Sequence, residues 1–110
     1  MAEDSQILIT RNDGKHRYEA RLAGEADDAV VGFGEYQLTD ELVVFTHTEV
    51  ADHCEGLGVG LALVRFALDD VAADGRRRVL PLCPFVKDWI GRHRDYVALV
   101  YGAPPSTARD

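Results

Sequence analysis

The sequence predicts a mixed α/β (α+β) domain, in which an antiparallel β-meander is followed by a β-α-β unit and a C-terminal helix. Three features support this prediction. Short runs of β-branched and aromatic residues, separated by Gly, Asn and Asp, fill the first 50 residues. From Leu61 the apolar residues follow the i, i+3, i+4, i+7 spacing of an amphipathic helix. Another apolar run follows this helix, and two strands joined through a helix are normally parallel.

The first half of the chain should form three antiparallel strands joined by tight turns, since Asn, Asp and Gly tolerate the left-handed angles that hairpins require. We expect strands over Gln6–Thr10, His16–Ala23 and Ala29–Leu38, with turns at Asn12-Asp13-Gly14, Gly24–Asp28 and Thr39-Asp40. Gly32 and Gly34 either weaken the third strand or mark a β-bulge in it.

The central segment is predicted to form a strand, a glycine loop and a helix. Leu42–Val50 is rich in Val, Thr and Phe, which suits a buried strand. Residues 51–55 lead to Gly56-Leu57-Gly58-Val59-Gly60, and the helix from Leu61 should stop at Asp74-Gly75. Glycines let a ligand approach the backbone, and a helix N-terminus favours an anion, so the loop is a candidate phosphate site. A simple tight turn is the alternative.

The C-terminal part should contain one more strand and one more helix. Arg78–Leu82 is the expected strand, after an arginine run at residues 76–78 that we interpret as a solvated turn. Cys83-Pro84 ends the strand, because proline suits the first position of a helix. The helix Phe85–Arg92 should bury Phe85, Val86, Trp89 and Ile90, and Asp95–Tyr101 should add a helical turn or two. A single domain over 1–102 would leave 103–110 as a flexible tail.

Composition narrows the function classes. The 110 residues are 46% hydrophobic and 28% charged, as in an ordinary globular domain. No apolar run approaches the roughly 20 residues of a membrane helix, and the N-terminus has no signal-peptide pattern, so we expect a cytoplasmic protein without a membrane partner. The net charge of −7 argues against nucleic-acid binding and favours cationic partners such as amines.

Several motifs resemble a known superfamily. The pattern Glu55-x-x-Gly58-x-Gly60, between a strand and a helix, is similar to the Gln/Arg-x-x-Gly-x-Gly/Ala acyl-CoA motif of the GNAT superfamily of N-acyltransferases. The words His47-Thr48-Glu49-Val50 and Pro81-Leu82-Cys83-Pro84-Phe85-Val86 resemble a subfamily of short, single-domain GNAT-like acetyltransferases. The resemblance extends from about Glu3 to Val100 and implies a compact GNAT-like fold.

The resemblance implies acetyl-CoA (or CoA) as the cofactor. Its pantetheine arm would lie between two splayed strands and bond to the backbone of Thr46–Val50, while loop amides would meet the pyrophosphate. Cofactor-binding residues are then expected to be Thr48, Val50, Glu55, Gly56, Leu57, Gly58, Val59, Gly60 and Leu61. Glu55 departs from the Gln or Arg of the motif, and its carboxylate must point away from a pyrophosphate.

Four residues are candidates for catalysis. Cys83 should cap the helix that starts at Pro84, where unpaired amides favour a thiolate nucleophile; a small buried core thiol is the alternative. His47 and Glu49 lie two apart on one strand and share a face, so either is a candidate base. A cross-strand ion pair for Glu49 and a hydrogen-bonded ring for His47 are the alternatives. By resemblance, Tyr96 would reprotonate the leaving thiolate; core packing with a surface hydroxyl is the alternative, and the favoured one.

Two other groups of polar residues are expected to have structural roles instead of chemical ones. Asp52-His53-Cys54-Glu55 contains metal-ligand types, but they are consecutive and lack a second cluster at zinc-site spacing, so we expect no metal. His53 and Cys54 should be exposed loop residues. His93 should cap the C-terminus of its helix, where the helix dipole favours positive charge.

The expected function is transfer of an acetyl group from acetyl-CoA to an amine, on a small molecule or a protein lysine. Typical GNAT chains carry two helices between their first strands to shape the acceptor pocket, whereas here Asn12-Asp13-Gly14 turns directly from strand to strand. The acceptor site must then be open, or be supplied by a partner macromolecule or another subunit. The alternative is a non-catalytic CoA-binding module that acts as a sensor or adaptor, and a plain protein-interaction domain is the third hypothesis.

Overall fold

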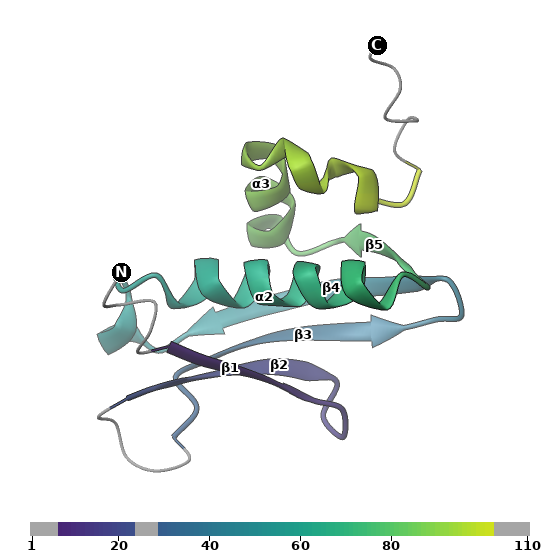
Figure 1. Cartoon of the computed structure of the whole chain (residues 1–110). Helices are drawn as coiled ribbons and strands as arrows, with labels where there is room; N and C mark the ends of the chain where they lie inside the picture. The colour runs from purple at the N-terminus through teal and green to yellow at the C-terminus, as the bar shows by residue number, and fades with distance from the viewer. Residues whose placement is uncertain (1–6, 24–28, 103–110) are drawn as a thin grey trace.

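The computed structural model describes residues 7–23 and 29–102, which form a five-stranded sheet with helices (Figure 1). The strands are β1 (Ile7–Asn12), β2 (Arg17–Leu22), β3 (Gly32–Leu38), β4 (Leu42–Val50) and β5 (Arg78–Pro81). They lie in the order β1-β2-β3-β4-β5, antiparallel except for the parallel pair β4 and β5. The predicted meander and β-α-β unit are therefore confirmed. The expected turn at Gly24–Asp28, the strand start at Gln6 and the tail 103–110 lie outside the described residues.

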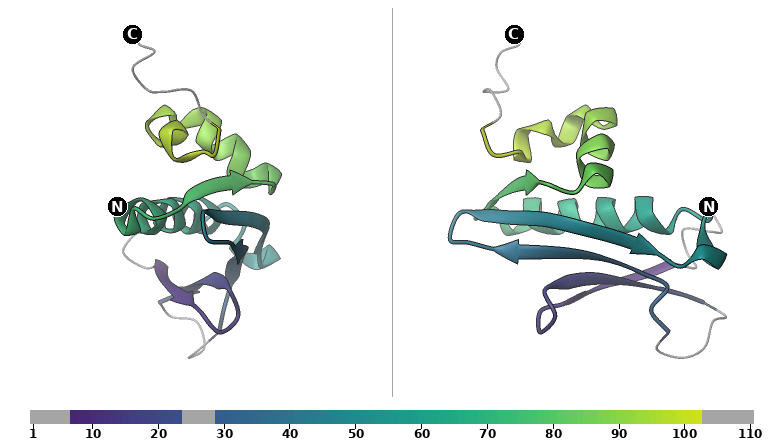
Figure 2. Two further views of the ribbon diagram at one scale, coloured as in Figure 1. Left: turned by 90° about the vertical axis from the view of Figure 1, so that its right-hand side faces the viewer. Right: turned by 180° about the vertical axis from the view of Figure 1, so that it is seen from behind.

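The helical elements are η1 (Asp52–Cys54), α2 (Val59–Asp74), α3 (Pro84–Arg92) and η2 (Arg94–Leu99). Helix α2 lies along one face of the sheet, and α3 and η2 sit beside β5 at its edge (Figure 1). Seen from behind, the opposite face of β3 and β4 has no described helix over it (Figure 2). The core therefore lies between the sheet and α2; its largest fully buried side chains are Leu63, Leu68, Val59, Val79 and Cys54.

Three details differ from the expectations. Helix α2 begins at Val59 instead of Leu61, with Gly58 as its N-cap, so Gly60 belongs to the first helical turn. Phe85 is 41% exposed, so it lies outside the core that its neighbours Val86, Trp89 and Ile90 enter. Cys54 is 1% exposed, because η1 turns it inward under the loop, whereas we expected an exposed residue.

The arginine run is also more ordered than a solvated turn. The side chain of Arg77 donates to the carbonyl of Thr39 at 2.7 Å, and that of Arg78 donates to the carbonyl of Ala98 at 2.7 Å. These bonds link the turn after α2 to the β3–β4 turn on one side and to η2 on the other. The run therefore has a structural role.

A β-bulge interrupts the pairing of β3 with β4. Glu35 pairs with His47 and Tyr36 pairs with Phe45, so Thr46 is the extra residue on β4. One extra residue shifts the alternation of side chains between the two faces of a strand. Phe45 therefore faces α2 before the bulge and Thr48 faces it after the bulge, while His47 lies on the opposite face. From Gly32 and Gly34 we had considered a bulge in β3 as one alternative; the extra residue lies instead on its partner, β4.

Gly32 on β3 lies close against α2. A Cβ atom there would lie 3.0 Å from the carbonyl oxygen of Glu49 and 3.0 Å from Cγ1 of Val59. We expect Gly32→Ala to lower the free energy of unfolding by about 2 kcal/mol, because neither the backbone nor the packed helix can yield easily. Urea unfolding measures this. Gly34→Ala is the control, since its Cβ meets nothing closer than 3.9 Å; equal losses in both variants would contradict the packing described here.

Glu19 is a buried carboxylate on the sheet face that lacks a helix. It is 4% exposed and accepts hydrogen bonds from Arg17 at 2.8 Å, Arg21 at 3.2 Å and Asn12 at 3.2 Å. Burial alone would raise the pKa of Glu19, but the hydrogen bonds from Arg17, Asn12 and Arg21 outweigh it and hold the pKa below its usual value.

The lowered pKa makes the stability contribution of Glu19 depend on pH. The contribution is fully present above the ordinary carboxylate pKa and is lost as the pH falls through the lower pKa of the folded state. We expect Glu19→Gln to cost about 1.5 kcal/mol near neutral pH, the value of hydrogen bonds to a charged group. The difference from wild type should shrink in acid. Urea unfolding across this range tests it, and a difference that grows in acid would contradict the assignment.

Candidate active site

The N-terminus of α2 lies beside the glycine loop, where Gly60 is partly exposed and Leu61 is exposed, whereas Val59 is buried. Gly58, the N-cap, has φ +86°, a left-handed conformation that glycine adopts without strain. The amide of Ala62 already bonds to the carbonyl of Gly58. The amides of Val59, Gly60 and Leu61 come before the first intrahelical bond, so they have no acceptor within the helix and lie at its positive dipole end. These three amides are the part of the predicted loop best suited to an anion.

Two other amides of the loop are already hydrogen-bonded within it. The amide of Glu55 bonds to the carbonyl of Asp52, and the amide of Leu57 bonds to that of Cys54. Gly56 also has φ +86°, and a Cβ there would meet nothing within 4 Å. Glu55 is exposed. The predicted amide donors therefore divide into two that stabilise the loop and those around Val59 that remain available.

An open hollow of about 410 Å³ surrounds this helix end. Its lining consists of Val50, Cys54, Glu55, Gly56, Gly58, Val59, Gly60, Leu61 and Phe85. The ring of Phe85 reaches α2, because a Cβ on Gly60 would lie 3.0 Å from Phe85 Cζ. A side chain at position 60 would therefore require the ring of Phe85 to move. The hollow connects the free amides to the end of β4.

Strands β4 and β5 separate next to this hollow. Their pairing covers Leu42–Phe45 on β4 and ends at Pro81 on β5. The amides of Leu82 and Cys83 both bond to the carbonyl of Phe45, and the chain then turns away into α3. Among the described residues, no strand pairs with the second half of β4 on its β5 side. We call this separation, between residues 46–50 of β4 and the start of α3, the fork.

Cys83 lies at the base of the fork. It is the N-cap of α3, as predicted, and its carbonyl accepts the amide of Lys87 at 3.0 Å. Its sulfur lies 3.5 Å from Oγ1 of Thr48, and the residue is only 4% exposed. The structure thus brings together two predicted site residues, one from each arm of the fork.

His47 and Glu49 also meet, on the face of β4 opposite α2. His47 Nε2 lies 2.8 Å from Glu49 Oε2, and their side chains are 50% and 60% exposed. The ring of Phe33 on β3 lies 6.1 Å from the His47 ring. The prediction that the two residues share a face is confirmed, and they form a hydrogen-bonded pair that is open to solvent.

Tyr96 lies apart from these groups. Its hydroxyl donates to Asp69 on α2 at 2.7 Å, and its ring packs edge-on against Trp89. The hydrogen bond to Asp69 raises the pKa of Tyr96. His93 is the C-cap of α3, as predicted, and its ring stacks on Trp89 with centroids 3.8 Å apart. These contacts assign both residues to the packing of α3 and η2 against α2.

Two features of the site were missed in the sequence. Phe85 was expected in the core, although it lines the hollow beside Gly60. The bulge at Thr46 has a signal in the sequence, because the apolar positions Val43 and Phe45 are followed by Val50 instead of a residue at an odd position. Such a change of parity within one strand indicates an inserted residue.

Within residues 7–23 and 29–102, no three or more His, Cys, Asp or Glu side chains lie close enough to hold a metal ion. None of the described helices has the length and apolar character needed to cross a membrane.

The comparisons with known proteins agree with this geometry. A family model described as GCN5-related N-acetyl-transferase matches residues 17–99. The chain belongs to this N-acetyltransferase family. The match runs from β2 to η2 and includes the glycine loop and the fork, so it contains every predicted site residue, while β1 lies outside it.

A solved structure has a similar fold over most of the chain. The solution structure of a GCN5-like protein from Staphylococcus aureus superposes with a TM-score of 0.66 at 18% identity, covering 96% of this chain and 99% of that one. At this identity the likeness concerns the fold. The comparison with curated proteins gives no match.

Proposed function

We propose that the protein binds acetyl-CoA at the N-terminus of α2 and transfers the acetyl group to an amine. The observation that carries the proposal is the continuous path from the free amides of Val59, Gly60 and Leu61, through the hollow beside Phe85, into the fork. A diphosphate matches the amides and the helix dipole. The unpaired backbone of β4 matches the two amides of a pantetheine arm. Membership of the family makes acetyl-CoA the ligand to test first.

From this path we also infer which end of the proposed ligand lies at α2 and which end lies in the fork. With its diphosphate at Val59, the pantetheine arm passes Val50 and Phe85, and its thioester reaches the base of the fork near Thr48 and Cys83. The thioester then lies in the plane of the sheet. An amine can approach it from the sheet face that carries His47 and Glu49, where no described helix intervenes (Figure 2).

We propose direct transfer between these groups. The carboxylate of Glu49, held by His47, accepts a proton from the amine directly or through one water. The amine nitrogen forms a bond to the thioester carbon, the bond from that carbon to sulfur breaks, and the CoA thiolate leaves and takes a proton from water. The hydroxyl of Tyr96 is committed to Asp69, so water is the simpler proton source.

A covalent route through Cys83 is the other mechanism. In it, the thiolate of Cys83 takes the acetyl group from CoA and later passes it to the amine. Cys83 is 4% exposed and its sulfur contacts Oγ1 of Thr48 at 3.5 Å, so the thiolate would have to leave this contact to attack the thioester carbon. Direct transfer needs no such rearrangement. We therefore propose that Cys83 and Thr48 position the thioester instead of carrying the acetyl group.

Calorimetry and an acceptor panel test the proposed function. We expect acetyl-CoA and CoA to bind with micromolar dissociation constants, and no heat at millimolar ligand would overturn the cofactor site. Release of free CoA would then be followed with polyamines, lysine peptides and basic proteins. Release above the rate of hydrolysis with one of these acceptors supports the transferase.

One observation favours a second candidate, the non-catalytic CoA-binding sensor or adaptor. The face of the sheet that carries His47 and Glu49 is open, and in the described residues no acceptor pocket is built around this pair. Binding of acetyl-CoA without CoA release across the whole panel would support this candidate over the transferase.

A further inference from the structure

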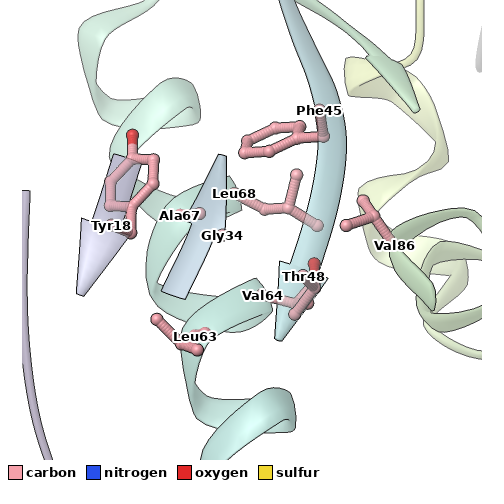
Figure 3. A pocket seen from close by; sticks show the side chains of 9 residues that line it. All are labelled: Tyr18, Gly34, Phe45, Thr48, Leu63, Val64, Ala67, Leu68 and Val86. Atoms are coloured by element: carbon pink, nitrogen blue, oxygen red, sulfur yellow. The ribbon is translucent and has the colours of Figure 1, made fainter. Parts of the chain in front are cut away.

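A small apolar pocket lies between the sheet and α2, on the inner side of the fork (Figure 3). Its floor comes from three strands, its roof from α2, and its edge from α3. The lining residues are Tyr18, Gly34, Phe45, Thr48, Leu63, Val64, Ala67, Leu68 and Val86. Only two of them carry polar atoms. The hydroxyl of Tyr18 is engaged with Asp70 at 2.8 Å, and that of Thr48 contacts Cys83.

The pocket exists because Gly34 has no side chain. Tyr18 pairs with Gly34, and Gly34 pairs with Thr48, so the three residues form one row across β2, β3 and β4. The position of Gly34 in this row leaves a gap beneath α2. A Cβ on Gly34 would have its nearest neighbour at 3.9 Å, the Oγ1 of Thr48. The equivalent gap in the next row is closed, because Gly32 lies against Val59 and Leu63.

The pocket lies next to the place where the thioester would end. Thr48 and Val86 mark its edge on the α3 side of β4 (Figure 3), and Oγ1 of Thr48 is 3.5 Å from the sulfur of Cys83. A group attached to the thioester carbonyl at the base of the fork would therefore have apolar space beyond it, past Thr48. A pocket lined by apolar side chains favours an apolar group over water.

We propose that this pocket is an acyl subsite, and that the protein accepts acyl groups longer than acetyl, with propionyl as the preferred donor group. This inference rests on the proposed function, because it needs the thioester to lie in the fork. The free space amounts to about one water molecule. One added carbon fits this space, whereas a medium-length acyl chain would require α2 to move away from the sheet. The subsite thus favours propionyl over both acetyl and hexanoyl.

The test compares CoA, acetyl-CoA, propionyl-CoA and hexanoyl-CoA by calorimetry with the full chain. Burial of one further CH₂ group should make propionyl-CoA bind about fourfold more tightly than acetyl-CoA. Hexanoyl-CoA should bind more weakly than either. In Gly34→Ala the added methyl group occupies the space, so the ratio of propionyl to acetyl affinity should fall to one or below. Gly91→Ala is the control, since its Cβ meets nothing within 4 Å, and it should keep the wild-type ratio.

The outcomes separate this inference from the function on which it rests. If acetyl-CoA and CoA bind but propionyl-CoA binds more weakly than acetyl-CoA, the subsite is wrong and the cofactor site stands. If none of the four ligands binds, the proposed cofactor site fails. An unchanged affinity ratio in Gly34→Ala, with a cooperative thermal transition showing that the variant is folded, also overturns the inference, because the space would then lie elsewhere.

Discussion

Gly58→Glu should abolish the binding of acetyl-CoA, with a loss of affinity of about 100-fold or more. The new carboxylate would stand at the N-cap of α2, next to the amides of Val59, Gly60 and Leu61, where we place the diphosphate. Two like charges about 4 Å apart near a protein surface repel by about 4 kcal/mol, which is more than enough for a 100-fold loss. Calorimetry with acetyl-CoA measures the effect.

Gly75→Glu is a matched control for this variant. Gly75 caps the opposite end of α2 with φ +72°, close to the +86° of Gly58, so the two substitutions add the same charge and similar backbone strain. We expect both variants to lose some stability and only the first to lose binding. Wild-type affinity in Gly58→Glu, or an equal loss in Gly75→Glu, would show that the ligand does not use this helix end.

Glu49→Gln should lower kcat/KM for acetyl transfer by about 100-fold, the lower end of what a positioned base contributes. Glutamine keeps a hydrogen bond to His47, but it cannot accept the proton of the attacking amine. The affinity for acetyl-CoA should stay close to wild type, because Glu49 points away from α2. Initial rates of CoA release with the best acceptor of the panel measure the effect, once that acceptor is known.

Two further variants show whether the loss belongs to Glu49. Glu35→Gln removes a carboxylate from the same sheet face, at the position that pairs with His47, and should change the rate by less than about threefold. Cys83→Ala should retain transfer if the acetyl group passes directly to the amine. An acetyl adduct on wild-type protein that is absent from Cys83→Ala and present in Cys54→Ala would instead establish the covalent route.

Local sequence patterns predicted most of the fold. Each strand and helix buries one face, and this leaves a periodic pattern of apolar residues. The pattern is visible in the alternation of Arg17–Leu22, the β-branched run of Leu42–Val50 and the helical spacing after Leu61. The Cys83-Pro84 boundary was also predictable, since proline restricts both its own backbone and that of the preceding residue.

The details of the site depend on contacts between distant residues, and local patterns do not record these. Gly60 lies in the first turn of α2, and the ring of Phe85, from another helix, occupies the space that a side chain there would need. Gly32 lies against Val59 and Leu63 of α2 whereas Gly34 does not, and the local pattern of β3 does not distinguish the two glycines. The partner of Tyr96 is likewise a residue of α2, 27 positions away in the chain.

The most direct measurement is a titration of ¹⁵N-labelled protein with CoA, followed through the backbone amide shifts. The largest changes should fall on Val59, Gly60 and Leu61, with a second group along residues 46–50 of β4 and at Cys83. Saturating CoA that left these amides unmoved, or moved others instead at the opposite end of α2 around Arg76 and Arg77, would contradict the proposed site.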